Sequence, residues 1–271
     1  MQQTHTPVTY KRDWRAALGA LRKLLANGDD TTQVFVIMRA LNGDSTPKNY
    51  HRLLRTPEGA RQAYQRVELA DRFSEPGFVD GFAPGTVGAA YRDWLRETGY
   101  TAQGLAEISN LDKVDRIEHP YAWFGRRNRD VHDLWHVLTG YKADETMGEA
   151  ALVAFSYAQT KGLGWALIAA GAALKSIRVT GGKLFARAVL EGYRLGKRAE
   201  WLLGEDYEAL LHEPLEAARK RLKLGEPVAY KRAQRELGHE LASYASTQQP
   251  ALTPPPLQPS QLRQLHRNGG H

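Results

Sequence analysis

The chain has 271 residues, of which 42% are hydrophobic and 25% are charged, and these values are ordinary for a globular protein. It contains no cysteine, which excludes disulfides, thiolate nucleophiles, iron–sulfur clusters and cysteine zinc sites. The net charge of +7 favours anionic partners, but the basic residues are scattered and no nucleic-acid motif accompanies them, so we predict no nucleic-acid partner.

The N-terminal half predicts helices separated by glycine and proline turns. No secretory signal peptide is visible, so we expect the chain to stay in the cytosol. The segment from Lys11 to Asn27 has leucines at helical spacing and predicts a first structural helix. Cap and stop signals predict four further helices, which run from Thr32 to Leu41, from Thr56 to about Leu69, from Thr86 to Gly99 and from Thr101 to Ile108.

A central helix follows Pro120, and we place it from about Tyr121 or Arg127 to Thr139. Gly140 allows it to end in a turn, and another helix begins near Thr146. The small-residue stretch from Ala150 to Leu174 predicts a buried or membrane-contacting helix. Its uncharged part, Gly162 to Leu174, has 13 residues, which is short of the ~20 that span a bilayer.

The C-terminal part predicts a helix from about Lys183 to Gly204 and then two short helices within Asp206 to Leu224, separated by Pro214. Beyond about Tyr244 the composition becomes rich in proline, glutamine and glycine, which is typical of disorder. We therefore predict an all-α fold, with a flexible N-terminus (1–9), a single multi-helix domain (10–243) and a disordered, proline-rich C-terminal tail (244–271).

Side chains that can bind a metal concentrate in the central helix and just after it. His132, Asp133 and His136 occupy positions i, i+1 and i+4, which fit within little more than a quarter of a helix's circumference. The turn at Gly140 would reverse the chain and bring Glu149 close to these three residues as a fourth ligand. Two imidazoles and two carboxylates suit a divalent metal ion, for which the ligand types favour zinc, with iron, cobalt and manganese as alternatives.

Three other interpretations use the same residues. A zinc protease of the His-Glu-x-x-His type needs glutamate where this chain has Asp133, so peptidase activity is disfavoured. A His-Asp phosphohydrolase would need His119 and Asp144 to complete its site, and it would leave His136 without a role. The third interpretation is structural, with Asp133 and His136 in a hydrogen-bond network between helices.

The motif resembles the signature of a ubiquinone-biosynthesis family, coenzyme Q biosynthesis protein 4, and the chain looks like a bacterial-type member. Twelve residues separate His136 from Glu149, one more than is usual in that family. The resemblance covers most of residues 10 to 225, and it rests on His132-Asp133-x-x-His136 with Gly148-Glu149, Asp30-Thr31-x-x-Val34-Phe35, Ala40-Leu41-x-Gly43, Pro57-Glu58-Gly59, Pro84-Gly85-Thr86-x-Gly88-x-x-Tyr91, Arg129, Gly196-Lys197-Arg198-Ala199 and the segment near Tyr207.

The resemblance implies a mainly helical protein that binds a divalent metal through His132, Asp133, His136 and Glu149. The implied reaction is metal-dependent, oxidative decarboxylation of a polyprenylated 4-hydroxybenzoate-derived intermediate, with hydroxylation at C1. Asp133 and Arg129 are then the candidate catalytic residues. Arg129, one turn before Asp133, could pair with the substrate carboxylate or with Asp130.

The resemblance also implies partners and a location. We expect a polyprenylated aromatic acid or quinone intermediate, a homodimer, other quinone-biosynthesis enzymes, and peripheral attachment of a cytoplasmic protein to the inner face of the cytoplasmic membrane. The small residues from Ala150 to Leu174 could line a tunnel for the prenyl tail or pack helices closely. The alternative function is that of a non-catalytic organiser, which binds prenyl lipids and gathers quinone-biosynthesis enzymes.

Overall fold

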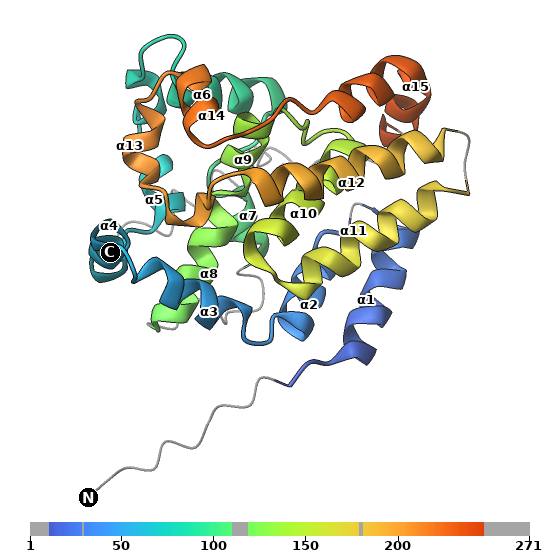
Figure 1. The fold of residues 1–271 in the computed structure, drawn as a ribbon, viewed down its shortest axis with the longest axis horizontal. Coiled ribbons are helices and arrows are strands. Elements are labelled where there is room, and N and C mark those ends of the chain that lie inside the picture. The colour runs from blue at the N-terminus through green and yellow to red at the C-terminus, as the bar shows by residue number, and fades with distance from the viewer. Residues whose placement is uncertain (1–10, 29, 110–118, 179–180, 247–271) are drawn as a thin grey trace, which may run out of the picture.

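The computed structural model of the chain describes residues 11–28, 30–109, 119–178 and 181–246. These residues form helices and no β-strand, which confirms the all-α, single-domain prediction (Figure 1). The predicted flexible N-terminus (1–9) lies outside them, as does the predicted tail (244–271) except for its first three residues, which end the last helix. The elements in chain order are α1 (Trp14–Ala26), α2 (Thr32–Leu41), α3 (Ser45–Leu53), α4 (Pro57–Gln65), α5 (Leu69–Phe73), the 3-10 helix η1 (Val79–Gly81), α6 (Val87–Thr98), α7 (Gly104–Ser109), α8 (Pro120–Asp130), α9 (His132–Thr139), α10 (Thr146–Thr160), α11 (Leu163–Ser176), α12 (Gly182–Arg198), the 3-10 helix η3 (Leu202–Gly204), α13 (Tyr207–Leu211), α14 (Leu215–Arg221) and α15 (Val228–Ser246).

Capping residues set the helix ends that the sequence predicts best. Asp13 accepts the backbone N–H of Ala16 at 2.9 Å and starts α1. Helix α2 has the predicted bounds. Helix α6 ends as predicted at Gly99, whose φ of 70° is the left-handed conformation that a helix C-cap commonly adopts. Pro214 separates α13 from α14, which confirms the predicted pair of short helices.

Three α-helices, α3, α5 and α15, were not predicted, and two predicted helices, α4 and α12, end earlier than expected, α12 at Arg198 rather than Gly204. Helix α3 has a mostly polar sequence, and its Pro47 lies in the first turn, where a missing N–H costs little. Helix α15 begins at Val228, beyond Leu224, where the last predicted helix ends. Helix α4 ends at Gln65 because Arg66 adopts a left-handed conformation with φ of 49°.

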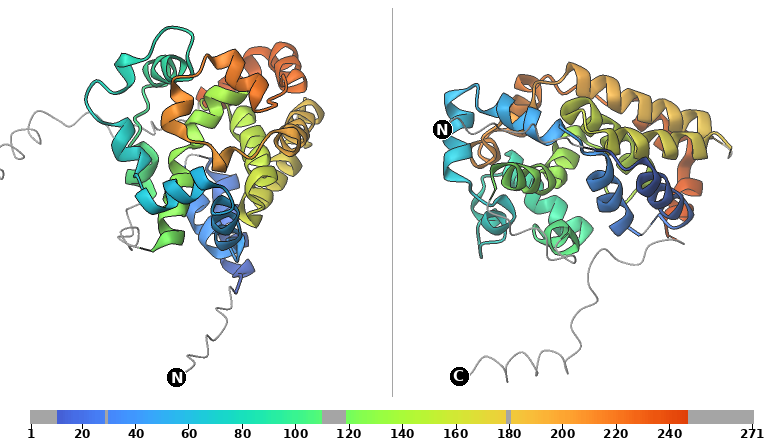
Figure 2. Two further views of the ribbon diagram at one scale, coloured as in Figure 1. Left: turned by 60° about the vertical axis from the view of Figure 1, so that its left-hand side comes forward. Right: turned by 90° about the horizontal axis from the view of Figure 1, so that it is seen from below.

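The predicted helix from Ala150 to Leu174 is in fact two helices, α10 and α11, and this prediction was wrong. Lys161 adopts φ of 58°, and the chain turns there before α11 begins. The two helices lie beside α12 in the central part of the molecule (Figures 1 and 2). Among the described residues, no helix combines the length and apolar character needed to cross a bilayer.

Glycines let α12 approach α10 until the two backbones touch. A Cβ atom on Gly192 would lie 2.2 Å from the carbonyl oxygen of Ala151, and one on Gly196 would lie 2.7 Å from that of Phe155. The small residues of α10 therefore serve close helix packing, one of the two roles predicted for them. Their predicted role in lining a prenyl tunnel stays a prediction.

The predicted central helix is divided at Val131 into α8 and α9, while its predicted end at Gly140 is confirmed. Gly140 has φ of 78° and donates its backbone N–H to the carbonyl of His136 at 2.8 Å. Helix α10 then starts at Thr146, as predicted. Helix α9 contacts α6, α8, α10 and α14, so nearly all of its side chains are buried.

Candidate metal centre

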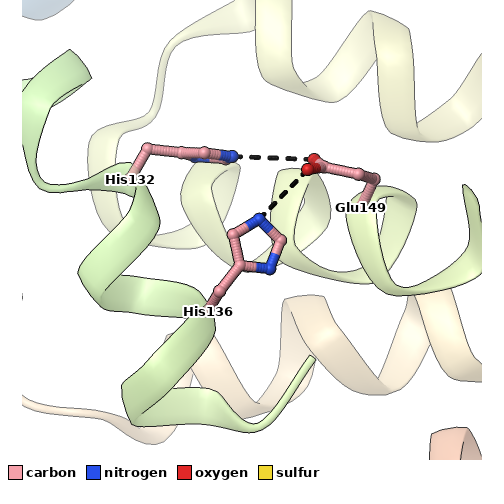
Figure 3. A group of neighbouring side chains, drawn as sticks. All are labelled: His132, His136 and Glu149. Atoms are coloured by element: carbon pink, nitrogen blue, oxygen red, sulfur yellow. Dashed lines mark hydrogen bonds and ion pairs between the residues drawn. The ribbon is translucent and has the colours of Figure 1, made fainter. Parts of the chain in front are cut away.

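Helices α9 and α10 bring three of the predicted ligands together. His132 and His136 project from adjacent turns of α9, and Glu149 projects from the first turn of α10 toward both (Figure 3). One ligand atom from each residue lies within 4.8 Å of the others, so the group could hold a metal ion. With twelve residues between His136 and Glu149, the carboxylate still reaches both histidines.

The Glu149 carboxylate lies between the two imidazoles. Its Oε1 atom is 3.1 Å from His136 Nε2, and its Oε2 atom is 3.6 Å from His132 Nε2. Burial raises the pKa of Glu149, but the charges and hydrogen bonds of His136 and His132 outweigh that effect and hold the pKa below its usual value. Glu149 is therefore an anion at neutral pH. Its side chain is 40% exposed, so an ion can reach it.

The backbone after α9 fixes the protonation of His136. The carbonyl oxygen of Tyr141 lies 2.8 Å from His136 Nδ1. A carbonyl can only accept, so Nδ1 carries a proton; the anionic Glu149 can also only accept, so Nε2 donates to it, and a metal ion would take the place of that second proton. The hydrogen bond to Tyr141 is the outer-shell contact that orients metal-binding histidines in many proteins.

Two tryptophans hold the imidazole rings from helices outside the motif. Trp165 of α11 stacks on His132, with ring centroids 5.9 Å apart and an interplanar angle of 10°. Trp94 of α6 stacks on His136 at 6.0 Å and 17°. These flat contacts restrict rotation of both rings and keep water from their faces. The Nε2 atoms are thus preset toward a common point.

The turn that carries Glu149 is fixed from two sides. A Cβ atom on Gly148 would lie 2.1 Å from the carbonyl oxygen of Lys142, so only glycine permits this close approach. At the end of α9, the Arg219 guanidinium donates to the carbonyls of Val137 and Leu138, each at 3.0 Å. Rigid backbone on both sides places Glu149 opposite the histidines.

The pattern of the family described as "Coenzyme Q (ubiquinone) biosynthesis protein Coq4" matches residues 3–228. The chain belongs to the Coq4 family. It is 27% identical over 227 residues to "Ubiquinone biosynthesis protein COQ4 homolog, mitochondrial" of Danio rerio, a match that covers 83% of this chain and 80% of that protein. It is 31% identical over 120 residues to "Ubiquinone biosynthesis protein coq-4, mitochondrial" of Neurospora crassa, covering 43% of this chain and 33% of that protein.

A crystal structure of a proposed ubiquinone biosynthesis protein from Nostoc punctiforme has the same fold. It superposes with a TM-score of 0.58 at 21% identity and covers 80% of this chain and 100% of that one. The family match confirms the resemblance that the sequence motif indicated, and the likeness to this crystal structure confirms the fold.

Asp133, the fourth predicted ligand of this Coq4 family member, lies outside the group of three. Its side chain is buried, and burial raises the pKa of Asp133 to about 7, with a further increase from Glu149 and Asp130 and a decrease from His132. A carboxyl group with that pKa can hold or release a proton at neutral pH. Its roles as a ligand and as a catalytic residue stay predictions.

Arg129 contacts Asp130, which is one of its two predicted partners. The Arg129 Nε atom lies 2.8 Å from Asp130 Oδ1, and Asp130 also accepts the backbone N–H of Ala70 at 3.3 Å. This pair joins the end of α8 to the start of α5 and lies just before His132. The predicted contact of Arg129 with a substrate carboxylate stays a prediction.

The phosphohydrolase interpretation gains no support from the described residues. His119 accepts the backbone N–H of Tyr121 at 3.2 Å and caps α8, and neither it nor Asp144 belongs to the metal-binding group. The structural interpretation, a hydrogen-bond network between helices, is confirmed in part, because His136 of α9 contacts Glu149 of α10. The same two atoms would face a metal ion.

Sequence reasoning missed the aromatic surroundings of the site. None of Trp94, Trp165 and Tyr100 was among the predicted site residues. Tyr100 lies edge-on against Trp94, and burial, together with the charges of Glu149, Asp133 and Asp144, raises the pKa of Tyr100 to about 12. It therefore stays a phenol that can donate a hydrogen bond. No local pattern identifies these residues, because they come from segments far away in the chain.

Proposed function

We propose that this Coq4 family member is a metal-dependent decarboxylase of ubiquinone biosynthesis. Its substrate is a polyprenylated 4-hydroxybenzoate-derived intermediate, from which it removes the C1 carboxylate oxidatively and leaves a hydroxyl group at C1. The observation that supports this most is the convergence of His132, His136 and Glu149 within 4.8 Å in a chain of this family. Three protein ligands leave coordination positions for a substrate.

A metal held by these three residues would supply a Lewis acid that polarises an oxygen of the substrate's carboxylate or phenol. Zinc, favoured by the ligand types, suits decarboxylation alone because it has no redox chemistry. Two histidines and one carboxylate with open positions are also the ligands of ferrous oxygenases. Since hydroxylation at C1 needs an external oxidant, the oxidative reaction favours iron over zinc in this proposal.

The chain's own residues would orient the ring and move the proton. We assign proton transfer to Asp133, because its pKa of about 7 allows both protonation states at neutral pH. Arg129 would bind the substrate carboxylate in exchange for its contact with Asp130. Trp94 and Trp165 would exclude water from the ring and keep the imidazoles aligned.

The remaining partners follow from the substrate. A tail of isoprene units stays in lipid, so we propose that the protein works while attached peripherally to the inner face of the cytoplasmic membrane. We also propose that it acts as a homodimer and near other quinone-biosynthesis enzymes, to which a membrane-bound intermediate can pass directly.

Variants of the ligands test this function in cells. His132→Ala and Glu149→Ala should remove the bound metal and cause carboxylated prenyl precursors to accumulate, measured by mass spectrometry of lipid extracts. His51→Ala is the matched control, since His51 is an exposed histidine that contacts Tyr121 away from the site. Normal quinone levels in folded, metal-free variants would contradict a catalytic role and favour the organiser.

Elemental analysis combined with native mass spectrometry of the purified protein tests the choice of metal. Iron at one ion per chain would support the oxidative reaction. Zinc with full activity and no consumption of oxidant would instead leave a simple decarboxylase.

A further inference from the structure

Large apolar side chains are exposed on three neighbouring helices. Helix α11 packs against both α1 and α12, and the three lie side by side (Figures 1 and 2). We call their outer surface the α1–α11–α12 face, and its exposed apolar residues, with their exposed fractions, are Trp14 (47%), Leu18 (49%), Leu174 (66%), Ile177 (53%) and Leu190 (46%).

Two contacts hold α1 alongside α11. The Leu21 side chain of α1 lies over Gly171 of α11, 3.0 Å from where a Cβ atom would stand. One turn further along, Lys175 donates to the carbonyl of Leu25 at 2.5 Å. Trp14 and Leu18 are on the same helical stripe as Leu21, two turns and one turn earlier along α1, and both are exposed.

The same face is basic. Residues 162–190 contain no aspartate or glutamate. Helix α12 exposes Lys183, Arg187, Arg194 and Lys197 at helical spacing on either side of Leu190. The acidic residue of α12, Glu191, is turned toward α15, where it accepts the backbone N–H groups of Ala229 and Tyr230 at 2.8 and 3.0 Å.

Basic residues on another face of the molecule are neutralised. Arg61 pairs with Asp206 at 2.5 Å, and Arg72 pairs with Glu208 at 2.7 Å. Arg221 pairs with Glu205 at 2.7 Å and with Glu213 at 2.8 Å. In the part of the chain that the structure describes, none of the ion pairs involves Lys183, Arg187, Arg194 or Lys197, and all four are exposed to solvent.

We propose that the α1–α11–α12 face docks onto an anionic phospholipid surface. The apolar side chains would enter the interface, while the lysines and arginines contact lipid phosphates. A second copy of the chain fits this face less well, because a twofold interface would oppose the same positive patch to itself. This inference rests on the proposed function, since a lipid-tailed substrate brings the enzyme to such a surface.

Helix α11 connects the docking face to the metal centre. Leu174 and Ile177 are on its outer side, whereas Trp165 on its inner side stacks on His132. A bilayer under this face would therefore lie one helix away from the ligands. An isoprenoid tail could stay in lipid while the ring occupies the site.

Vesicle flotation with the full chain tests the proposal. The wild type should bind vesicles of phosphatidylcholine with phosphatidylglycerol, bind vesicles of phosphatidylcholine alone much less, and dissociate at high salt. The double variant Arg187→Glu and Arg194→Glu should lower partitioning by about tenfold or more. The double variant Leu174→Ser and Ile177→Ser should lower it by about tenfold.

Matched controls change similar residues elsewhere. Tyr64→Ser removes an apolar side chain that is 89% exposed on α4. The double variant Arg61→Glu and Arg221→Glu reverses two charges on the other face, and both controls should bind vesicles as the wild type does. Circular dichroism checks that every variant is folded.

Two vesicle results would overturn docking: unchanged binding by the face variants, or equal binding of the wild type to both kinds of vesicle. A third such result is a change from dimer to monomer in the face variants, measured by light scattering, with no change in vesicle binding. His136→Ala separates this inference from the proposed function, because it should lose metal and still float with vesicles. Normal vesicle binding by the face variants, together with metal-dependent quinone synthesis, would leave the function standing and the docking face disproved.

Discussion

The two sides of α10 are built in opposite ways. Toward α12, glycines replace side chains and the backbones touch at Gly192 and Ala151. Toward α9, side chains fill the space, and Glu149 meets the two histidines. Ala151 is only two residues beyond Glu149. The close contact with α12 therefore fixes the position of Glu149 along the axis of α10.

The largest expected effect comes from removing a ligand. His136→Ala should lower metal affinity by more than about a hundredfold, which exceeds the loss typical of outer-shell changes. Isothermal titration of the metal-free protein measures it, with His51→Ala as the control. Tight binding by His136→Ala would show that the histidines are not the ligands.

The next largest effect is expected from disrupting the close contact between α10 and α12. Gly192→Ala places a methyl group against the Ala151 carbonyl and should destabilise the fold by about 1–3 kcal/mol, measured by urea unfolding. Gly19→Ala in α1 is the matched control, because its Cβ meets nothing within 4 Å, and it should stabilise by up to about 1 kcal/mol. Weaker metal binding by folded Gly192→Ala would show that the packed side positions Glu149, and unchanged stability would refute the close contact.

A smaller effect is expected for the aromatic supports. Trp165→Leu frees one face of His132 and should weaken metal binding about tenfold, in the range of other outer-shell changes. Titration of Trp14→Leu, which alters a tryptophan away from the site, provides the comparison. Equal affinity in both variants would mean that stacking does not preset the imidazole.

The smallest effect on metal affinity is expected for Asp133→Asn, less than about tenfold, because Asp133 lies outside the group of three. Its raised pKa has a separate consequence. The folded protein binds the proton more tightly than the unfolded chain does, so this carboxyl costs stability as pH rises from about 4 to about 7. In urea unfolding of the metal-free protein over that range, the stability of the variant should fall less, or rise more, with pH than that of the wild type. Loss of metal would instead establish Asp133 as a ligand.

Local signals explain which parts were predictable. The bounds of α2 and the ends at Gly99 and Gly140 follow from caps and left-handed glycines, which act over a few residues. The break at Lys161 was missed because α10 and α11 are both apolar on most sides, so periodicity does not separate them. Helix α3 was missed because its packing against α8, and not an apolar stripe, stabilises it.

The site residues likewise separate into those that local sequence predicts and those that it does not. His132 and His136 were predictable because their spacing alone puts them on one face, and Glu149 followed from the turn at Gly140. Asp133 shares the motif, but one step along a helix turns a side chain by about 100°, and this one points into the core. The two stacked tryptophans come from α6 and α11, and only tertiary packing could reveal them.

The carbonyl of Tyr141 accepts the Nδ1 proton of His136 just after the end of α9, and it lies before the connection that leads to α10. Insertions or deletions among residues 142–145 would therefore leave the proton arrangement on the α9 side unchanged, provided that Gly148 can still reach its neighbouring carbonyl. The number of residues between the second histidine and the glutamate is consequently a poor criterion for recognising this site in other chains. The glycine directly before the glutamate is a better one.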